Sequence, residues 1–396
     1  MGRGFDVDFP SVVCDSLENV DGKECIAIMA TTAAQSAQLA LSEFDSASTE
    51  RSIVIPSQAY GNGAATFNLP KAGIPTFIEV IFNGTLSRTE GTTVGTVTAN
   101  PGWPFNILDI STLTDPAGLT RLSVNGEDLY DLELTKNYGV YPRDPYSQES
   151  YADLIYQAAI PSGVASSTTS GTIQFGVVFP VSYTKDSVLG SFVATVPNGT
   201  ATLTLVESKL TGSTVNFPLT TSGGSTVSLT GTWSPTYYYR DAPSTLPVPV
   251  AALSQVHELY HTASNENLSA GQTCQTVLLT GRQYMRLIQR LYANNEADFT
   301  NVDRVQFLVN SSTPTYDETL ASYLFRMRMR YGRDFPNGMI YRDFTRSPWS
   351  PNTYGSLTAQ LVLGSTFTAG SYSNLVSLRE CLYVPTGNVT AIGAGS

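Results

Sequence analysis

Short runs rich in Val, Ile, Thr, Phe and Tyr recur along the chain, separated by clusters of Gly, Pro, Asn and Ser. Runs of this length between turn residues are typical of the strands of a β-sandwich or barrel. In the first half they predict strands at residues 52–56, 76–83, 106–110, 120–124, 172–179, 201–206, 226–229 and 236–240. In the second half they predict strands at 273–280, 302–309, 339–341, 357–363 and 377–384. The pattern therefore indicates an all-β protein.

Four segments carry helix start and stop signals instead, which predicts short helices inserted between strands. Two of them follow capping-box spacings, Thr280 with Gln283 and Thr315 with Glu318. Gly332 lies where a helix C-cap is expected after the second of these. The predicted helices are residues 281–292, 317–331, 126–136 with Asn125 as the cap, and 150–159.

A proline-rich stretch separates the two sets of strands. Residues 241–250 read DAPSTLPVPV and hold three prolines, which remove backbone donors and prevent a helix or a central strand from running through. We therefore predict a domain boundary there. The expected organisation is an N-terminal arm at 1–25, a first domain at 26–243 and a second domain at 244–396.

Composition narrows the class of protein. The 396 residues are 41% hydrophobic, which suits a chain with a packed core, and only 14% are charged. The formal net charge of −11 is uneven, because residues 1–243 hold 23 acidic and 11 basic side chains whereas 244–396 hold 10 and 11. Without a basic field to gather phosphates, general nucleic-acid binding is disfavoured.

The chain also lacks several recognisable signals. No run approaches the ~20 apolar residues of a membrane span, and the first ten residues lack the apolar core of a signal peptide. The four cysteines are far apart and form no metal-binding pair, so we expect buried free thiols at Cys14, Cys25, Cys274 and Cys381.

All eleven basic residues of the second half are arginines, and four of them gather near the end of a predicted helix: Arg326, Arg328, Arg330 and Arg333. Arginine favours bidentate pairing with carboxylates, and the acidic first half offers many of them. Contacts between subunits or domains are the favoured interpretation. A solvated helix face and a phosphate-binding patch remain as alternatives.

One motif suggests chemistry. His257, Glu258 and His261 match H-E-x-x-H, which on a helix places two imidazoles on one face with a general base beside them. These are the only two histidines, so a third zinc ligand would have to come from a residue such as Glu296. A zinc-dependent hydrolase is therefore the alternative hypothesis of function.

Weaker motifs have simpler interpretations. Residues 61–66 approach a dinucleotide-binding glycine pattern but lack its last glycine, so a turn is expected. N-x-[ST] sequons occur at Asn83, Asn198, Asn267, Asn310 and Asn388, and we interpret them as loop markers.

The order of several segments resembles the double jelly-roll major capsid proteins of tectivirus-like, membrane-containing bacteriophages. The most specific segment is DFPNGMIY at 334–341 after the arginine-rich helix end, followed by Tyr354 and Gly355 before a strand. Further similar segments are residues 43–45, 51–52, 179–183, 189–190, 196–197 and 246–248. The similarity runs from about Glu43 to the C-terminus.

This resemblance implies two eight-stranded jelly rolls with short helical insertions, and three chains forming a pseudo-hexagonal capsomer of an icosahedral virion. Neighbouring capsomers, penton proteins and minor capsid proteins are the implied partners, and an internal viral membrane is expected nearby. The protein would be made in the host cytoplasm and located in the capsid shell. We accordingly predict a structural protein without catalytic, cofactor-binding or metal site.

The N-terminal arm departs from those relatives. Residues 1–25 contain six acidic and two basic side chains, so attraction to anionic lipid is not expected. Binding to neighbouring capsomers or to a minor protein is the better hypothesis for this arm.

Overall fold

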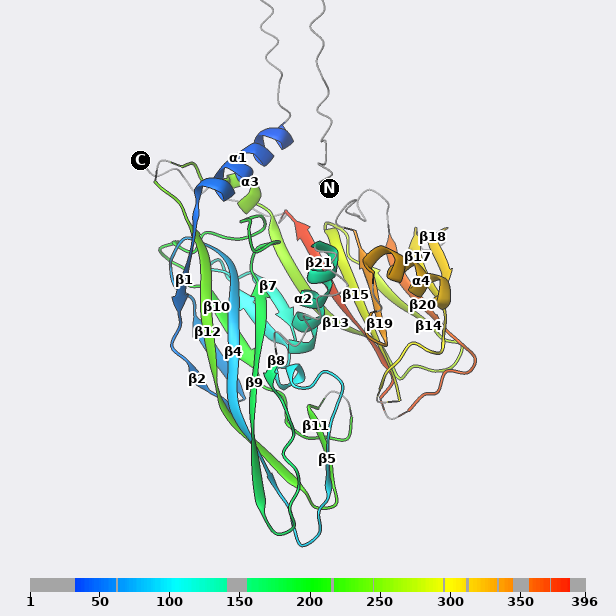
Figure 1. Ribbon diagram of the computed structural model, residues 1–396. Coiled ribbons are helices and arrows are strands. Elements are labelled where there is room, and N and C mark those ends of the chain that lie inside the picture. The colour runs from blue at the N-terminus through cyan, green and yellow to red at the C-terminus, as the bar shows by residue number, and fades with distance from the viewer. Residues whose placement is uncertain are drawn as a thin grey trace, which may run out of the picture.

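A computed structural model of the protein describes residues 33–61, 63–140, 155–214, 217–244, 246–294, 296–310, 313–332, 335–344, 356–370 and 372–384. The predicted arm at 1–25 lies outside these residues. Two bodies of β-strands lie side by side, with one helix between them (Figure 1).

The first body is a sandwich of two four-stranded antiparallel layers. One layer has the order β1 (Thr49–Val54), β12 (Thr226–Asp241), β4 (Ile74–Thr89), β9 (Thr168–Pro180). The other has the order β3 (Ala64–Asn68), β10 (Thr202–Val206), β6 (Ser111–Thr114), β7 (Thr120–Val124). Eight strands thus enclose the first core.

The second body repeats this arrangement. One layer has the order β13 (Val256–Glu266), β21 (Asn374–Tyr383), β15 (Gln283–Ala293), β19 (Met339–Asp343). The other has the order β14 (Thr273–Leu278), β20 (Leu357–Leu363), β17 (Val302–Val309), β18 (Thr313–Thr319). Two eight-stranded units confirm the predicted double jelly roll.

Short elements complete the described chain. They are β2 (Gln58–Ala59), β5 (Thr96–Ala99), β8 (Ile155–Gln157), β11 (Leu219–Ser222), β16 (Glu296–Ala297), a 3-10 turn at Phe105–Ile107, α1 (Ala33–Ala47), α2 (Gly126–Val140), α3 (Val250–Leu253) and α4 (Leu320–Tyr331). None of the helices in the described ranges is long and apolar enough to cross a bilayer.

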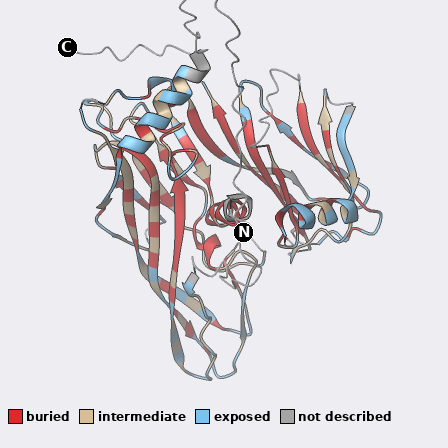
Figure 2. Cartoon of the chain, turned by 45° about the horizontal axis from the view of Figure 1, so that its top comes forward, coloured by how far each residue is buried: buried red, intermediate tan, exposed pale blue. Residues whose placement is uncertain are grey.

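Aromatic rings fill the first core. The fully buried Trp233 of β12 packs at ring-centroid distances of 4.6 Å from Phe82 and 6.0 Å from Phe175. Its indole N–H donates to Glu207 Oε1 at 3.1 Å, so burial leaves no polar atom of this side chain unpaired. Figure 2 shows such buried positions alternating with exposed ones along the strands, as the period of a half-buried strand requires.

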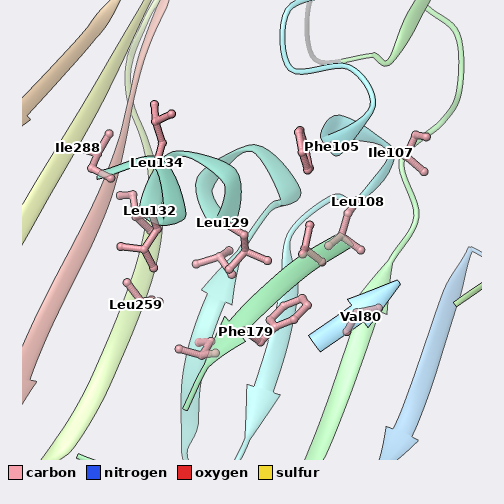
Figure 3. Packing of buried hydrophobic residues seen from close by; sticks show 14 of the residues in the cluster. Val80, Phe105, Ile107, Leu108, Leu129, Leu132, Leu134, Phe179, Leu259 and Ile288 are labelled. Carbon is pink, nitrogen blue, oxygen red and sulfur yellow. The ribbon is translucent and has the colours of Figure 1, made fainter. Parts of the chain in front are cut away.

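The two bodies share one continuous sheet. β7 of the first pairs in parallel with β13 of the second, Leu122 opposite Leu259, and this joins their layers into nine strands. α2 packs over this junction: Leu132 of α2 lies beside Leu259 and Ile288 (Figure 3), and all three belong to one buried cluster. We call the β7–β13 junction together with α2 the seam.

Several predicted elements are confirmed. The strands at 120–124, 302–309 and 357–363 have the predicted bounds, and Asn125 caps α2 with a 2.8 Å bond from Asp128 N to its side-chain oxygen. Gly332 adopts the left-handed C-cap conformation after α4, with φ 73°. α4 starts later than predicted, however, because residues 313–319 form β18 and Thr319, not Thr315, is the cap.

The predicted helix at 281–292 is wrong, because residues 283–292 belong to β15. Nearly every residue of β15 is buried, on both faces, since one face meets the second core and the other meets α2. The apolar positions therefore satisfied a helical stripe and a doubly buried strand equally well.

Two shorter predictions are also wrong. Residues 106–110 start in the 3-10 turn rather than a strand, and residues 155–157 of the predicted helix at 150–159 form β8. Residues 150–154 lie outside the described chain.

Replacing Trp233 with Ala should lower the free energy of unfolding by about 3–5 kcal/mol, because a large fully buried ring leaves a cavity. Chemical denaturation of the purified protein measures this loss. Val164→Ala, at a 51% exposed position of the same body, is the control and should change stability by less than about 0.5 kcal/mol. Equal stability of both variants would contradict the core described here.

Candidate functional site

The H-E-x-x-H segment lies on β13, not on a helix, so the alternative hypothesis of a zinc-dependent hydrolase loses its geometric basis. On a strand, His257 and His261 share a face but stand roughly 13 Å apart along it, and Glu258 points to the opposite face. Two imidazoles at that spacing cannot ligate one zinc ion, whose Zn–N bonds are about 2 Å long. The spacing on β13 therefore does not support the alternative hypothesis of a hydrolytic centre.

His257 belongs to a buried ion-pair cluster. Its Nε2 lies 3.1 Å from Glu380 Oε1, and the other oxygen of Glu380 pairs with Arg286 of β15. The His257 backbone N–H donates to Gly190 O of the first body at 2.9 Å. The side chain thus ties β13 to β21, while its backbone ties β13 to the first body.

The Glu258 carboxylate binds other side chains of the second body. Its carboxylate accepts from Arg282 Nε at 2.6 Å and from the Cys381 thiol at 3.3 Å. Glu296, the suggested third ligand, lies apart on the short strand β16. Among the described residues, no group of three or more His, Cys, Asp or Glu side chains could hold a metal ion.

The cysteines in the described chain are buried and unpaired, as predicted for Cys274 and Cys381. Burial raises the pKa of the Cys274 thiol to about 11, and burial together with Glu258 raises the pKa of Cys381 well above its usual range. Both thiols stay protonated at neutral pH and lack the character of nucleophiles. Cys14 and Cys25 lie outside the described residues.

His261 links the two bodies. Its Nδ1 lies 2.8 Å from Asp128 Oδ2 of α2, and both side chains are mostly buried. Burial alone would lower the pKa of His261. The Asp128 carboxylate and, to a smaller extent, the nearby Asp109 raise this pKa by more than burial lowers it, so it lies above the usual 6.5. A protonated His261 therefore stabilises the seam.

Arg290 forms the second ionic link. Its guanidinium pairs with Glu127 and Asp131 of α2, and the Tyr292 hydroxyl donates to the Glu127 carboxylate at 2.7 Å. Arg290 and Tyr292 lie on the face of β15 that meets α2. These contacts show that Arg290 serves the contact between domains that the arginine-rich composition suggested.

A cavity of about 380 Å³ lies at the seam. Both bodies line it, with Asp109, Asn125 and Asp128 on one side and Arg290 and Asn374 on the other. Most of its charged groups already pair with one another, so the cavity is a gap in a polar contact rather than a formed active site.

Gly190 makes a close contact between the first body and β13. It has φ +78°, and a Cβ added there would lie 2.7 Å from His257 Cβ and 2.9 Å from His257 N. Its carbonyl accepts the His257 N–H and also Arg121 Nη1 at 3.0 Å. Only glycine combines this left-handed backbone with so close an approach.

The other sequence-predicted sites have structural roles. Gly61 and Gly63 adopt positive φ and their N–H groups both donate to Glu207 Oε2 at 2.9 Å, so the predicted turn binds a carboxylate of its own chain. Arg326 pairs with Glu318 and Arg330 with Asp343 within the second body. Arg333 and Asn388 lie outside the described residues.

The acidic face of α2 was missed by the sequence interpretation. Glu127 and Asp131 are one helical turn apart, a spacing that places both carboxylates on one face where a single arginine can bridge them. That spacing was a usable signal, but their partner lies on a strand about 160 residues later in the chain, at sequence separations of 163 and 159.

Gly190→Ala should lower the free energy of unfolding by about 2 kcal/mol or more, because it adds a strained φ and a clash with the β13 backbone. Thermal unfolding of the purified variant measures the loss. Gly118→Ala is the matched control, since Gly118 also has positive φ but a Cβ there meets nothing within 4 Å. If both substitutions cost the same, the close approach at the seam has no energetic role.

The His261–Asp128 pair should make stability depend on pH. Because the folded pKa is raised, the stabilisation is complete below the unfolded value near 6.5 and is lost as pH rises through the folded pKa. Asp128→Asn should reduce this pH-dependent part, which we expect to be about 1 kcal/mol. Denaturant unfolding of both proteins at pH 5.5 and pH 9 provides the test, and identical pH dependence would exclude the pair as its source.

No protein-family model and no curated protein matches the sequence. Solved structures do match the fold. The STIV MCP has a TM-score of 0.62 at 16% identity, over 85% of this chain and 97% of that one. An atomic structure of Sulfolobus turreted icosahedral virus gives 0.60 at 16% identity, over 85% and 91%. PBCV-1 VP54, fitted into a reconstruction of the virophage Sputnik, gives 0.50 at 10% identity, over 85% and 94%.

The alignments cover nearly the whole length of the first two structures and 85% of this chain. The similarity therefore includes both bodies and not a single shared sandwich. The strand order supports the same assignment independently. The chain has the double jelly-roll fold of viral major capsid proteins.

Proposed function

We propose that the protein is a major capsid protein, a structural subunit of an icosahedral virion that works without catalysis or cofactor. The observation that carries the proposal is the duplication itself: one chain holds two eight-stranded rolls with the same strand order, joined by a shared sheet. The STIV MCP, whose fold is the same, supports this function.

A two-roll subunit has a geometric use. Three copies around one axis present six similar units, and a near-hexagonal outline tiles a facet through lateral contacts that can each be weak. We propose a homotrimeric capsomer that contacts neighbouring capsomers, with penton and minor capsid proteins as further partners. In this proposal the two rolls correspond to residues 26–243 and 244–396, and the N-terminal arm contacts neighbours.

The charge of the chain is consistent with a shell position. A net charge of −11 gives no basic surface for neutralising packaged nucleic acid, so we propose no direct contact with the genome. An internal viral membrane between shell and genome, as in the tectivirus-like phages that the sequence resembles, agrees with this charge. Synthesis in the host cytoplasm and assembly into the capsid shell complete the proposal.

The purified protein should have a solution mass close to three times its chain mass of 42.6 kDa, and that mass should survive dilution. Light scattering coupled to size-exclusion chromatography measures it. A monomer at every concentration would contradict the capsomer proposal, and a sugar-binding monomer would point to a lectin-like sandwich instead.

A further inference from the structure

The two bodies correspond strand by strand. In chain order, β1, β3, β4, β6, β7, β9, β10 and β12 of the first occupy the places of β13, β14, β15, β17, β18, β19, β20 and β21 of the second. Each layer has the same neighbours in both bodies, β1-β12-β4-β9 matching β13-β21-β15-β19 and β3-β10-β6-β7 matching β14-β20-β17-β18. An interaction found on one body can therefore be sought at the matching place on the other.

The seam is such an interaction. Among the described strands, the matching pair of strands does not form the same contact within the chain. The seam joins β7 to β13. The counterparts of these strands are β18 and β1, and among the described strands β18 pairs with β17 alone and β1 with β12 alone. Both are edge strands, and most of their described residues are exposed. Two free sheet edges of this kind are available for pairing with another chain.

The helices that follow β7 and β18 place buried and outward-facing residues at the same positions counted from their N-caps. α2 follows β7 with Asn125 as N-cap, and α4 follows β18 with Thr319 as N-cap. Counting from the caps, the fourth residue is buried in both helices, Leu129 in α2 and Tyr323 in α4. The two helices thus turn the same face toward their own bodies.

The same count identifies the outer face of each helix. In α2, the second, third and sixth residues after the cap are Glu127, Asp128 and Asp131, which cross the seam to Arg290 and His261.

In α4 the same three positions are Ala321, Ser322 and Phe325, and all three are exposed. Phe325 is 68% exposed, and Met329, one turn further on the same side, is 72% exposed. The pale outer side of α4 in Figure 2 contrasts with the buried α2. The face that α2 uses at the seam is thus left uncovered on α4.

The receiving face has a counterpart as well. α2 packs on the side of the β13-β21-β15 layer that points away from the second core. On the β1-β12-β4 layer, the side that points away from the first core carries Val54, Phe77, Ile81 and Tyr238.

This face is mixed in character and partly open to solvent: Glu79 lies on it between Phe77 and Ile81 and accepts from the Tyr238 hydroxyl at 3.2 Å. Val54 is 76% exposed, and Phe77 stacks on Tyr238 at 4.2 Å while both remain half-buried. Its apolar side chains match Phe325 and Met329 of α4, as the Arg290 and His261 face matches the acidic α2.

We propose that a second copy of this chain covers α4: its β1-β12-β4 face receives Phe325 and Met329, and its β1 edge lies alongside β18. The contact repeats the seam between copies. It joins different surfaces of the two partners, so it is heterologous and closes into a ring of three, which rests on the trimer proposed above.

The test uses two variants and one control. Phe325→Asp with Met329→Asp disrupts the helix side, Val54→Asp disrupts the sheet side, and Val164→Asp places the same charge at a 51% exposed position on neither surface. Each disrupted surface should shift trimer dissociation to at least ~30-fold higher protein concentration, the size of a hot-spot loss. Sedimentation velocity over a dilution series measures this, and the control should dissociate like the wild type.

Mixing the two disrupted proteins gives a sharper readout. The intact α4 of the Val54→Asp chain can dock on the intact sheet of the Phe325→Asp/Met329→Asp chain, but the reverse contact is blocked. Equal amounts should therefore form a one-to-one dimer that neither protein forms alone. Circular dichroism melts matching the wild type show that each variant is folded, and the two sides provide independent variants.

The outcomes separate the two proposals. Variants that remain trimeric like the wild type, or that fail to form the mixed dimer, overturn this interface while leaving the capsomer in place. A wild-type protein that is monomeric at all concentrations overturns the capsomer and this contact with it.

Discussion

The relative placement of the two rolls depends on the seam. A parallel pairing of β7 with β13 turns two layers into one nine-stranded sheet, and α2 covers the junction. Backbone pairing sets the direction of one roll against the other, and the ion pairs of Asp128 with His261 and of Glu127 and Asp131 with Arg290 hold the helix in place. Removing one member of such a buried pair would leave a charge without a partner, which costs more than the pair contributes.

This dependence has a functional meaning if the chain is the capsid subunit that we propose. If three chains are to present six similar units, the angle between the rolls within a chain must match the angle between chains. The seam sets the first angle, and the α4 contact that we propose would set the second with the same strands and helix. The chemistry differs, however. Within a chain, ion pairs add to the apolar cluster of Leu132, Leu259 and Ile288, and the rolls are already covalently connected. A contact between copies must offset the entropy of association and gains more from apolar burial.

One local pattern gave a wrong prediction, and the alternative interpretation of another fails for the same reason. Residues 281–292 and the H-E-x-x-H segment both suggest helices, yet they form β15 and β13, which lie in the same layer on either side of β21. β15 is covered on both faces along nearly its whole length and β13 is at residues 256–259, so these segments lack the alternation of a half-buried strand. Of the residues that mimic a metal motif, His261 pairs across the seam with Asp128, whereas the side chains of His257 and Glu258 pair within the second body. His257 and His261 find Glu380 and Asp128, each more than 120 residues away.

The sequence alone was enough to predict features that depend on residues close together in the chain. The pattern of apolar residues predicted the bounds of β7, β17 and β20, and Asn125 and Gly332 act as helix caps, because strand alternation and capping involve neighbours in the chain. The strand pattern predicted the all-β class, and the sequence resemblance implied two rolls. Their internal duplication left no repeat in the sequence, since many side chains can fill equivalent strand positions. Only the tertiary structure decided which strands pair across the chain, which charges are buried together and which helix face stays uncovered, because those contacts join residues that are distant in sequence and become neighbours only when both rolls have folded.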